Sequence, residues 1–146
     1  MPAVTDNPTL NPSRRKSRRR ALDALYAADL RGSSASEILG DTLRRMGKDA
    51  PPHMAYAEQL VEGVVTHAER IDELLSTYAE GWTLDRMPAV DRNLARIAVY
   101  EIVYRDDIDD AVAISEAVTL ATELSTDSSP TFLNGLLARI AEHASR

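Results

Sequence analysis

The sequence has no cysteine and no long hydrophobic run, and each absence excludes a class of protein. Without cysteine the chain forms no disulfide bond and no thiolate metal site, as expected in a reducing compartment. No apolar run approaches the ~20 residues that a membrane-spanning helix requires. The charged N-terminus also lacks the apolar segment of a signal peptide. We therefore expect a cytoplasmic protein with no membrane partner.

Residue patterns typical of catalytic and cofactor sites are missing as well. There is no glycine-rich phosphate loop, no nucleophile elbow and no histidine pair with metal-ligand spacing. The aspartates within residues 106–110 lack the glycine and the distal glutamate of a calcium loop. We predict no enzyme activity, no metal and no cofactor, and we expect Asp109 or Asp110 to cap the helix that follows.

Hydrophobic residues make up 44% of the 146 residues, which is enough for one buried core. They recur with the period of a helix, and no stretch alternates as a half-buried strand does. We predict an all-α fold of about seven helices in a single domain over residues 1–146, with a flexible segment at 1–12.

Capping residues set the expected helix boundaries. Asn11–Pro12 suits the start of the first helix and Gly32 its end. Ser34 with Glu37 forms a capping box for a second helix that stops at Gly47.

The later boundaries follow from run length and from proline. The periodic run over residues 52–81 is long for one helix, so a break is expected near 67–69. Pro88 suits the first turn of the next helix, which is apolar on nearly all sides from Leu94 to Tyr104 and is therefore expected to be central and buried. The last helix is expected to have Ser129 as its cap and Pro130 in its first position.

Two ionisable residues interrupt the central apolar helix. Arg96 and Glu101 are five residues apart, which places them about 140° apart around the helix, so they cannot pair with each other. A buried charge without a partner costs several kcal/mol. We expect Arg96 to pair with Glu116 across the core and to be structural.

Charge is distributed unevenly along the chain. Residues 1–20 hold six basic side chains and one acidic one, giving +5, whereas the whole chain has a net charge of −6. A basic segment on an acidic body is typical of a protein that binds a polyanion. A solvated tail is the alternative, and membrane attachment is disfavoured because no bulky apolar anchor precedes Leu22.

The basic segment is expected to be an unstable helix start. Its cations at residues 14–16 would lie in the first turn, where the helix dipole is already positive. No apolar residue before Ala21 offsets their repulsion by burial. We expect the segment to fray until RNA phosphate, or the acidic surface of a second copy, supplies an anion.

Four segments together indicate a known family. In chain order they are RRKSRRRALDALYAADL, WTLDRMPAVDRNLARIAVYEI, AVAISEAVTLA and FLNGLLARI. With them the chain resembles the bacterial transcription antitermination factor family NusB, from about residue 14 to residue 140. The resemblance implies two three-helix bundles packed across each other and no catalysis.

The same resemblance implies a function and partners. Family members bind the boxA sequence of nascent RNA as a heterodimer with NusE, a small-subunit ribosomal protein. With other Nus factors and RNA polymerase they suppress premature termination in ribosomal RNA operons, and homodimers occur among them.

The resemblance also assigns an RNA-binding site. Its residues are Arg14, Arg15, Lys16, Arg18, Arg19, Tyr26, Tyr78, Asp91 and Phe132. Arginine and lysine suit phosphates, and Tyr26 and Phe132 offer faces for unstacked bases. Tyr26 and Phe132 also fit the core, which is the alternative for both, while Tyr78 and Asp91 are expected near the RNA or the partner.

The sequence departs from the family pattern at three places. Ser115 replaces an asparagine, Thr122 replaces a frequent lysine, and the segment SSPT before Phe132 lacks a basic residue. These changes predict weaker RNA binding by the protein alone.

Three other functions compete with antitermination. A NusB-like accessory module of a ribosomal RNA methyltransferase would require a methyl-donor-binding domain after Arg146. A helix-turn-helix DNA reader would need basic residues on a recognition helix rather than on an N-terminal segment. An interaction scaffold would bind NusE but little RNA.

Overall fold

The computed structural model describes residues 12–144, within which the regular structure is entirely helical. Residues 1–11, including the expected cap Asn11 and most of the segment expected to be flexible, lie outside the described residues. The described elements are α1 (Pro12–Arg31), α2 (Ala35–Met46), η2 (Gly47–Asp49), α3 (Met54–Thr66), α4 (Ala68–Tyr78), η3 (Leu84–Arg86), α5 (Ala89–Tyr104), α6 (Asp110–Leu124) and α7 (Ser129–His143).

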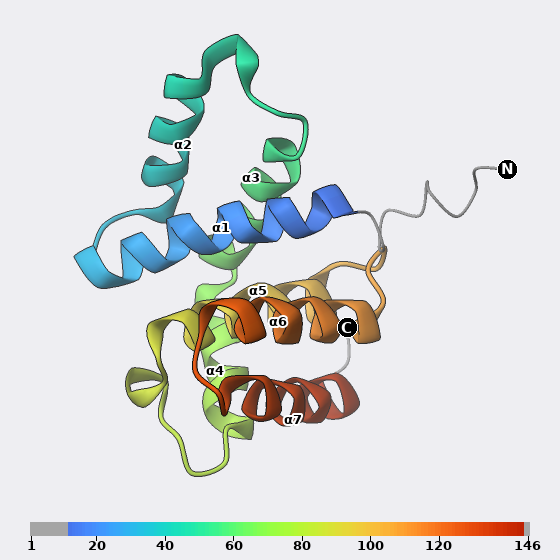
Figure 1. Ribbon diagram of the computed structural model, residues 1–146. Coiled ribbons are helices and arrows are strands. Elements are labelled where there is room, and N and C mark those ends of the chain that lie inside the picture. The colour runs from blue at the N-terminus through green and yellow to red at the C-terminus, as the bar shows by residue number, and fades with distance from the viewer. Residues whose placement is uncertain (1–11, 145–146) are drawn as a thin grey trace, which may run out of the picture.

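The helices form two bundles that pack across each other (Figure 1). Helices α1, α2 and α3 pack together in one bundle, and α5, α6 and α7 pack together in the other. Helix α4 packs on α5 and α7 and adds a fourth member to the second bundle. The contact between the bundles is made mainly by α1 on α5. The predicted all-α fold of two bundles is therefore confirmed.

Local capping explains the boundaries of the early helices. The Ser34 hydroxyl accepts a hydrogen bond from the backbone N–H of Glu37 at 3.2 Å, as the capping box predicts. Gly47 ends α2 with a φ of 58°, a conformation that favours glycine. The long periodic run breaks at His67, between α3 and α4, as expected.

Two capping predictions need correction. Asp109 is the N-cap residue of α6, but its side chain makes no capping hydrogen bond. Helix α7 begins one residue earlier than predicted, with Ser128 as its N-cap. Ser129 is buried inside the first turn because its hydroxyl donates to Asp91 Oδ2 at 2.7 Å.

Helix α5 is the central helix of the molecule. It contacts helices of both bundles, namely α1, α3, α4, α6 and α7. Its apolar side chains are buried around most of its circumference, at Leu94, Ala95, Ile97, Ala98, Val99 and Ile102. The prediction of a central, buried helix is confirmed. Among residues 12–144, no helix has the length and apolar character needed to cross a membrane.

Gly63 allows close packing of α3 on α5. A Cβ atom at Gly63 would lie 2.2 Å from two ring atoms of Tyr100, so the Tyr100 ring rests directly on the α3 backbone. Gly63→Ala would force that ring to move, and we expect a loss of about 1–3 kcal/mol in the free energy of unfolding. Urea denaturation measures it.

Gly40→Ala is the matched control. Gly40 lies inside α2. A Cβ atom added there would lie 3.5 Å from the nearest atom, which belongs to the Arg44 side chain, and this is an ordinary contact distance. Alanine there should leave stability unchanged or raise it by up to about 1 kcal/mol, because glycine is a poor helix former. If both variants changed the free energy of unfolding equally, the close approach of Tyr100 to Gly63 would not matter for stability.

Candidate nucleic-acid interface

A groove whose lining includes four cationic and two acidic side chains lies between α1 and α6. The two helices begin on the same side of the molecule (Figure 1), and the basic segment forms the first turns of α1. The groove has a volume of about 570 Å³. Its lining residues are Arg15, Lys16, Arg19, Arg20, Asp23, His53, Leu120 and Glu123.

Arg15 of α1 forms an ion pair with Glu116 of α6 beside the groove. Its side chain is 49% exposed, and its Nε and Nη2 donate to the two carboxylate oxygens of Glu116 at 3.0 and 2.6 Å. The hydrogen bonds from Arg15 to Glu116 raise the pKa of Arg15. This bidentate pair fixes the guanidinium at the groove wall while leaving half of it open to solvent.

Arg18, expected as a phosphate contact, lies in the core instead. Its side chain is only 2% exposed, and its Nε and Nη2 donate to Glu101 at 3.0 and 2.9 Å. Arg18 precedes the buried residues Ala21, Leu22 and Leu25 by three, four and seven positions. It therefore lies on the same, buried face of α1. It therefore has no surface to offer to RNA.

Glu101 and Glu116 supply the anions that the basic segment needs. Arg18 also donates to Glu116 at 3.3 Å, so Arg15 and Arg18 share that carboxylate. Ser17 adds an anchor, since its hydroxyl donates to the backbone oxygen of His53 at 2.7 Å. The segment expected to fray is thus helical from residue 12 onward, because its partners come from the same chain.

Tyr56 completes this buried network. Its hydroxyl donates to Glu101 Oε2 at 2.5 Å. Burial, together with the charge of Glu101, raises the pKa of Tyr56, so the hydroxyl stays a donor. The Arg14 guanidinium lies over the Tyr56 ring at 3.7 Å from its centroid. Arg14, also expected at the RNA, is therefore half-buried and held by this ring.

The prediction that Arg96 pairs with Glu116 is wrong. Arg96 Nε and Nη2 donate to the Asp72 carboxylate at 2.9 and 3.1 Å, and Nη1 lies 3.4 Å from Asp29. Arg96 faces α4 and α1, whereas α6 packs on another side of α5, where Glu101 meets Glu116 through Arg18. The structural role expected for Arg96 agrees with these pairs.

A second pocket, of about 370 Å³, lies beside the start of α7. Its lining residues are Trp82, Met87, Pro88, Asp91, Thr126, Ser128 and Phe132. Asp91 is only 2% exposed, and its two oxygens accept hydrogen bonds from the Ser125 and Ser129 hydroxyls at 2.5 and 2.7 Å. The two predicted residues Asp91 and Phe132 thus share one site.

The remaining predicted residues lie outside these linings. Tyr26 is 37% exposed and follows Asp23 of the groove by three residues, which places it on the same side of α1. Tyr78, at the end of α4, stacks on His143 with ring centroids 5.8 Å apart. It lines neither of the two pockets.

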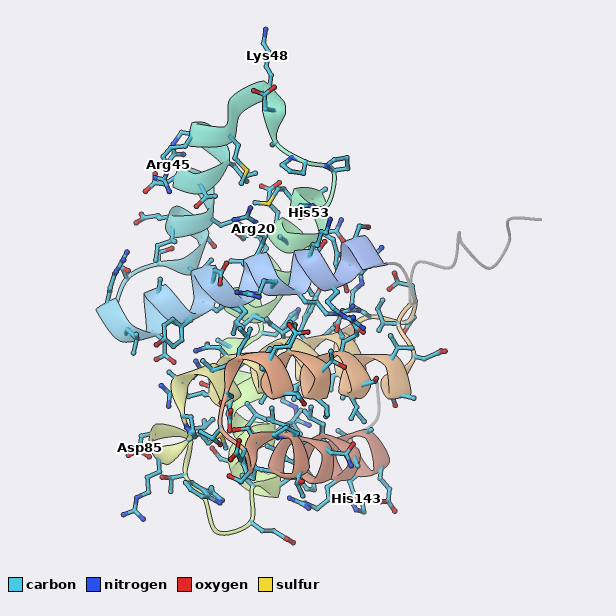
Figure 2. The ribbon with its side chains drawn as sticks, viewed as in Figure 1. Arg20, Arg45, Lys48, His53, Asp85 and His143 are labelled. Carbon is cyan, nitrogen blue, oxygen red and sulfur yellow. The ribbon has the colours of Figure 1, made fainter. Side chains whose placement is uncertain are left out.

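The groove and the second pocket both have lining residues near the end of α6. Glu123 lines the groove and Thr126, three residues later, lines the pocket. Several lining residues are not among those predicted from the sequence, and they include Arg20, His53 and Trp82. The helical phase of the basic run could have indicated Arg20, and Trp82 opens one of the four segments that indicate the family, but no local pattern marks His53. Figure 2 shows Arg20 and His53 near each other, on the side of α1 toward α2 and α3.

Fold and groove together define a class: a two-bundle helical protein whose surface carries a groove lined by four cations. The chain belongs to the NusB family, whose profile matches residues 15–142.

Relatives and solved structures agree with this assignment. The transcription antitermination protein NusB of Salinispora arenicola is 64% identical over 135 residues, covering 92% of this chain and 99% of its own. That of Thermobifida fusca is 56% identical over 130 residues, 89% of each chain. The structure of T. maritima NusB matches with a TM-score of 0.80 and 32% identity, over 91% of this chain and 93% of its own. A crystal structure of antitermination factors NusB and NusE in complex with dsRNA matches with a TM-score of 0.78 and 26% identity, over 89% and 96%.

Proposed function

We propose that this protein is a non-catalytic transcription antitermination factor that binds boxA RNA together with NusE. With other Nus factors it would act on RNA polymerase in ribosomal RNA operons, in the cytoplasm. The relatives' shared name supports the process, and the related complex of NusB, NusE and dsRNA supports the partners. The observation that carries the proposal is the cationic groove between α1 and α6.

The groove has the electrostatics required for an RNA strand. Arg15 and Arg19 are each 49% exposed in their side chains, and Lys16 is exposed beside them. The chain as a whole carries −6, so a polyanion is repelled elsewhere and directed to this groove. Phosphate contacts from these cations would supply affinity without sequence preference.

Sequence preference requires contacts to bases. Tyr26 lies on the groove side of α1, and Phe132 lines the pocket at the end of α6. Bases that leave the stack can pack on such rings, which single-stranded RNA permits. Asp91 lines the same pocket, and we propose that Tyr78, which lines neither the groove nor the pocket, lies near the RNA or NusE.

Filter binding with boxA RNA, scrambled RNA and duplex DNA, each with and without NusE, tests the proposal. We expect boxA RNA to bind most tightly, and NusE to tighten binding because the protein alone lacks two basic positions of the family pattern. Equal binding of duplex DNA would favour a DNA reader, and NusE binding without RNA binding would favour a scaffold. Sedimentation of the same samples shows whether a homodimer exists and whether RNA or NusE dissociates it.

His53 should make RNA binding depend on pH. Burial, and then the charges of Arg20 and Lys16, lower the pKa of His53 below its ordinary value. A phosphate in the groove would raise that pKa again, so the complex would hold more protons than the free protein. Affinity must then increase as the pH falls from 8 to 6, by less than about tenfold for one proton. Titrations of labelled RNA at each pH measure this.

The control for this pH effect is His53→Gln, which keeps a polar side chain but cannot titrate. Its affinity should be flat across the same range. A wild-type curve that is equally flat would place the RNA phosphates away from His53.

A further inference from the structure

Lysine is rare in this chain. Of its 17 lysine and arginine side chains only two are lysines, Lys16 and Lys48. Arginine and lysine differ in chemistry, because an arginine stays protonated in proteins whereas a lysine amine can lose its proton and become a nucleophile. Lys16 is exposed and lines the groove between α1 and α6. Arginines alone would supply the charge of this groove, so the lysine adds a reactive group to it.

Guanidinium groups surround Lys16 in the groove. Three arginines and two acids line it together with Lys16 and His53, namely Arg15, Arg19, Arg20, Asp23 and Glu123. The lining therefore carries a net positive charge, and guanidinium groups bind phosphate oxygens through paired N–H donors. The groove volume of about 570 Å³ also leaves room for a small organic phosphate. Such a molecule would lie beside the Lys16 amine.

His53 provides a proton acceptor near this amine. The Ser17 hydroxyl, one residue along α1 from Lys16, donates to the backbone oxygen of His53 at 2.7 Å and holds His53 beside this turn of the helix. Burial, and then the charges of Arg20 and Lys16, lower the pKa of His53, so its imidazole is mainly neutral around neutral pH. A neutral imidazole accepts the proton that a lysine must lose before it attacks a carbonyl group.

Lys48 offers a comparison within the same chain. It is exposed in η2 and lines neither the groove nor the second pocket. Figure 2 shows its side chain pointing away from the rest of the molecule. Arg44 and Arg45 precede it by four and three residues, so cations lie near both lysines along the chain. A difference in reactivity between the two lysines would therefore come from the groove.

We propose that Lys16 is an acylation site: the groove arginines hold the phosphate of an acyl phosphate, and the Lys16 amine takes over the acyl group. The Lys16 ammonium gives one proton to His53, which passes it to solvent. The Nζ lone pair then forms a C–N bond to the acyl carbon while the C–O bond to phosphate breaks. Inorganic phosphate leaves with the electrons of that bond and with one more proton from Nζ. The product is an uncharged amide.

The amide removes one of the four cations from the groove, because acylation abolishes the charge of a lysine. A bound RNA strand then loses one phosphate contact. For a single strand this loss flattens the slope of log affinity against log salt by ~0.7, which corresponds to about fivefold at 0.1 M salt. Acyl phosphate would thus lower RNA binding. This consequence rests on the proposed function, whereas the acylation itself does not.

Acetyl phosphate is the probe for the acylation site. It is added to the full chain, and peptide mass spectrometry follows acetylation of each lysine. We expect Lys16 to react at least about tenfold faster than Lys48, because a cationic cleft concentrates an anionic reagent by that factor or more. Inorganic phosphate should compete and slow Lys16 alone. Equal rates at the two lysines, or no protection by inorganic phosphate, would overturn the inference.

Two further measurements separate the phosphate site from the base. Acetic anhydride has no phosphate for the arginines to hold, so it should show a smaller preference for Lys16. His53→Gln keeps all four cations, so inorganic phosphate should still protect Lys16, but its rate with acetyl phosphate should fall several-fold. Lys48 in the same protein is the control. An unchanged Lys16 rate in His53→Gln would overturn the role of His53 as proton acceptor.

The affinity for boxA RNA, measured before and after acetylation, tests the consequence for RNA binding. Excess reagent is removed before NusE is added. Treatment should weaken binding about fivefold in the wild type and in Lys48→Arg. It should leave the affinity of Lys16→Arg at that variant's own untreated value, because acetyl phosphate does not acylate an arginine.

The outcomes distinguish this inference from the proposed function. Unchanged wild-type affinity after complete acetylation of Lys16 overturns the consequence for RNA binding and leaves the proposed function standing. Absence of RNA binding by the untreated protein with NusE overturns the proposed function and that consequence together. The relative acetylation rates of Lys16 and Lys48 decide the acyl-phosphate site in either case, since no RNA is present when they are measured.

Discussion

Arg18→Ala is expected to lower the free energy of unfolding by about 3–5 kcal/mol. The substitution removes the guanidinium that donates to Glu101, whose side chain is fully buried. Glu101 would keep only the Tyr56 hydroxyl, and its buried carboxylate would lose its cationic partner. Urea denaturation followed by circular dichroism measures the loss. Glu101→Gln should produce a similar loss, because it leaves the Arg18 charge without its main partner.

Arg19→Ala is the control for Arg18→Ala, one residue along the same helix. Arg19 is 49% exposed, and its contact with Asp23 is 3.9 Å long. Its removal should change stability by no more than about 0.5 kcal/mol. A triple variant with Arg18→Leu, Glu101→Leu and Tyr56→Phe should regain most of the loss, since no charge is then left buried. Equal stability of Arg18→Ala and Arg19→Ala would show that the buried pair contributes nothing and would return Arg18 to the RNA-binding set.

Local signals in the sequence predicted the helices because caps and periodicity act over a few residues. The Ser34–Glu37 box, the left-handed Gly47 and the break at His67 all depend on neighbours in the chain, so the sequence alone contains them. The start of α7 was misplaced for a different reason. Ser129 has the chemistry of a cap, but its hydroxyl is used by Asp91, which is 38 residues earlier in the chain.

The ion-pair partners of the charged residues were harder to predict than the helices, because they depend on which helices meet. Arg96 has carboxylates on α1 and α4 within reach, and nothing in its own segment distinguishes these from Glu116. Arg18 is different, since the phase of Ala21, Leu22 and Leu25 already places it on the buried face of α1. Because five other cations surround it in the sequence, Arg18 was predicted to be exposed with them.

For the same reason, only part of the candidate site could be predicted. The exposed cations of α1 could be read from composition, and Phe132 and Asp91 came from the family resemblance. His53 and the role of Trp82 could not be predicted, because both residues lie in connecting segments and reach the two pockets only through the packing of the bundles. Both pockets are assembled from residues that are distant in the chain.

Removing the four groove cations together should have the largest effect on RNA binding. In this variant Arg15, Lys16, Arg19 and Arg20 become alanine, while Arg18 stays paired with Glu101 and Glu116. Each lost phosphate contact flattens the dependence of log affinity on log salt by ~0.7 for a single strand, so four contacts give about 2.8. That slope corresponds to a loss on the order of several hundred-fold at 0.1 M salt. Alanine favours helix, so the fold should be retained.

The control variant removes the same charge from other surfaces. It replaces four exposed cations outside the groove, Arg31, Arg44, Arg45 and Lys48, by alanine. Arg45 and Lys48 lie toward the end of α2 that is farthest from α1 (Figure 2). If the groove holds the phosphates, this variant loses only the weak long-range attraction, which salt screens, and keeps a slope near that of the wild type. Equal slopes in the two variants would mean that net charge alone, and not the groove between α1 and α6, attracts the RNA.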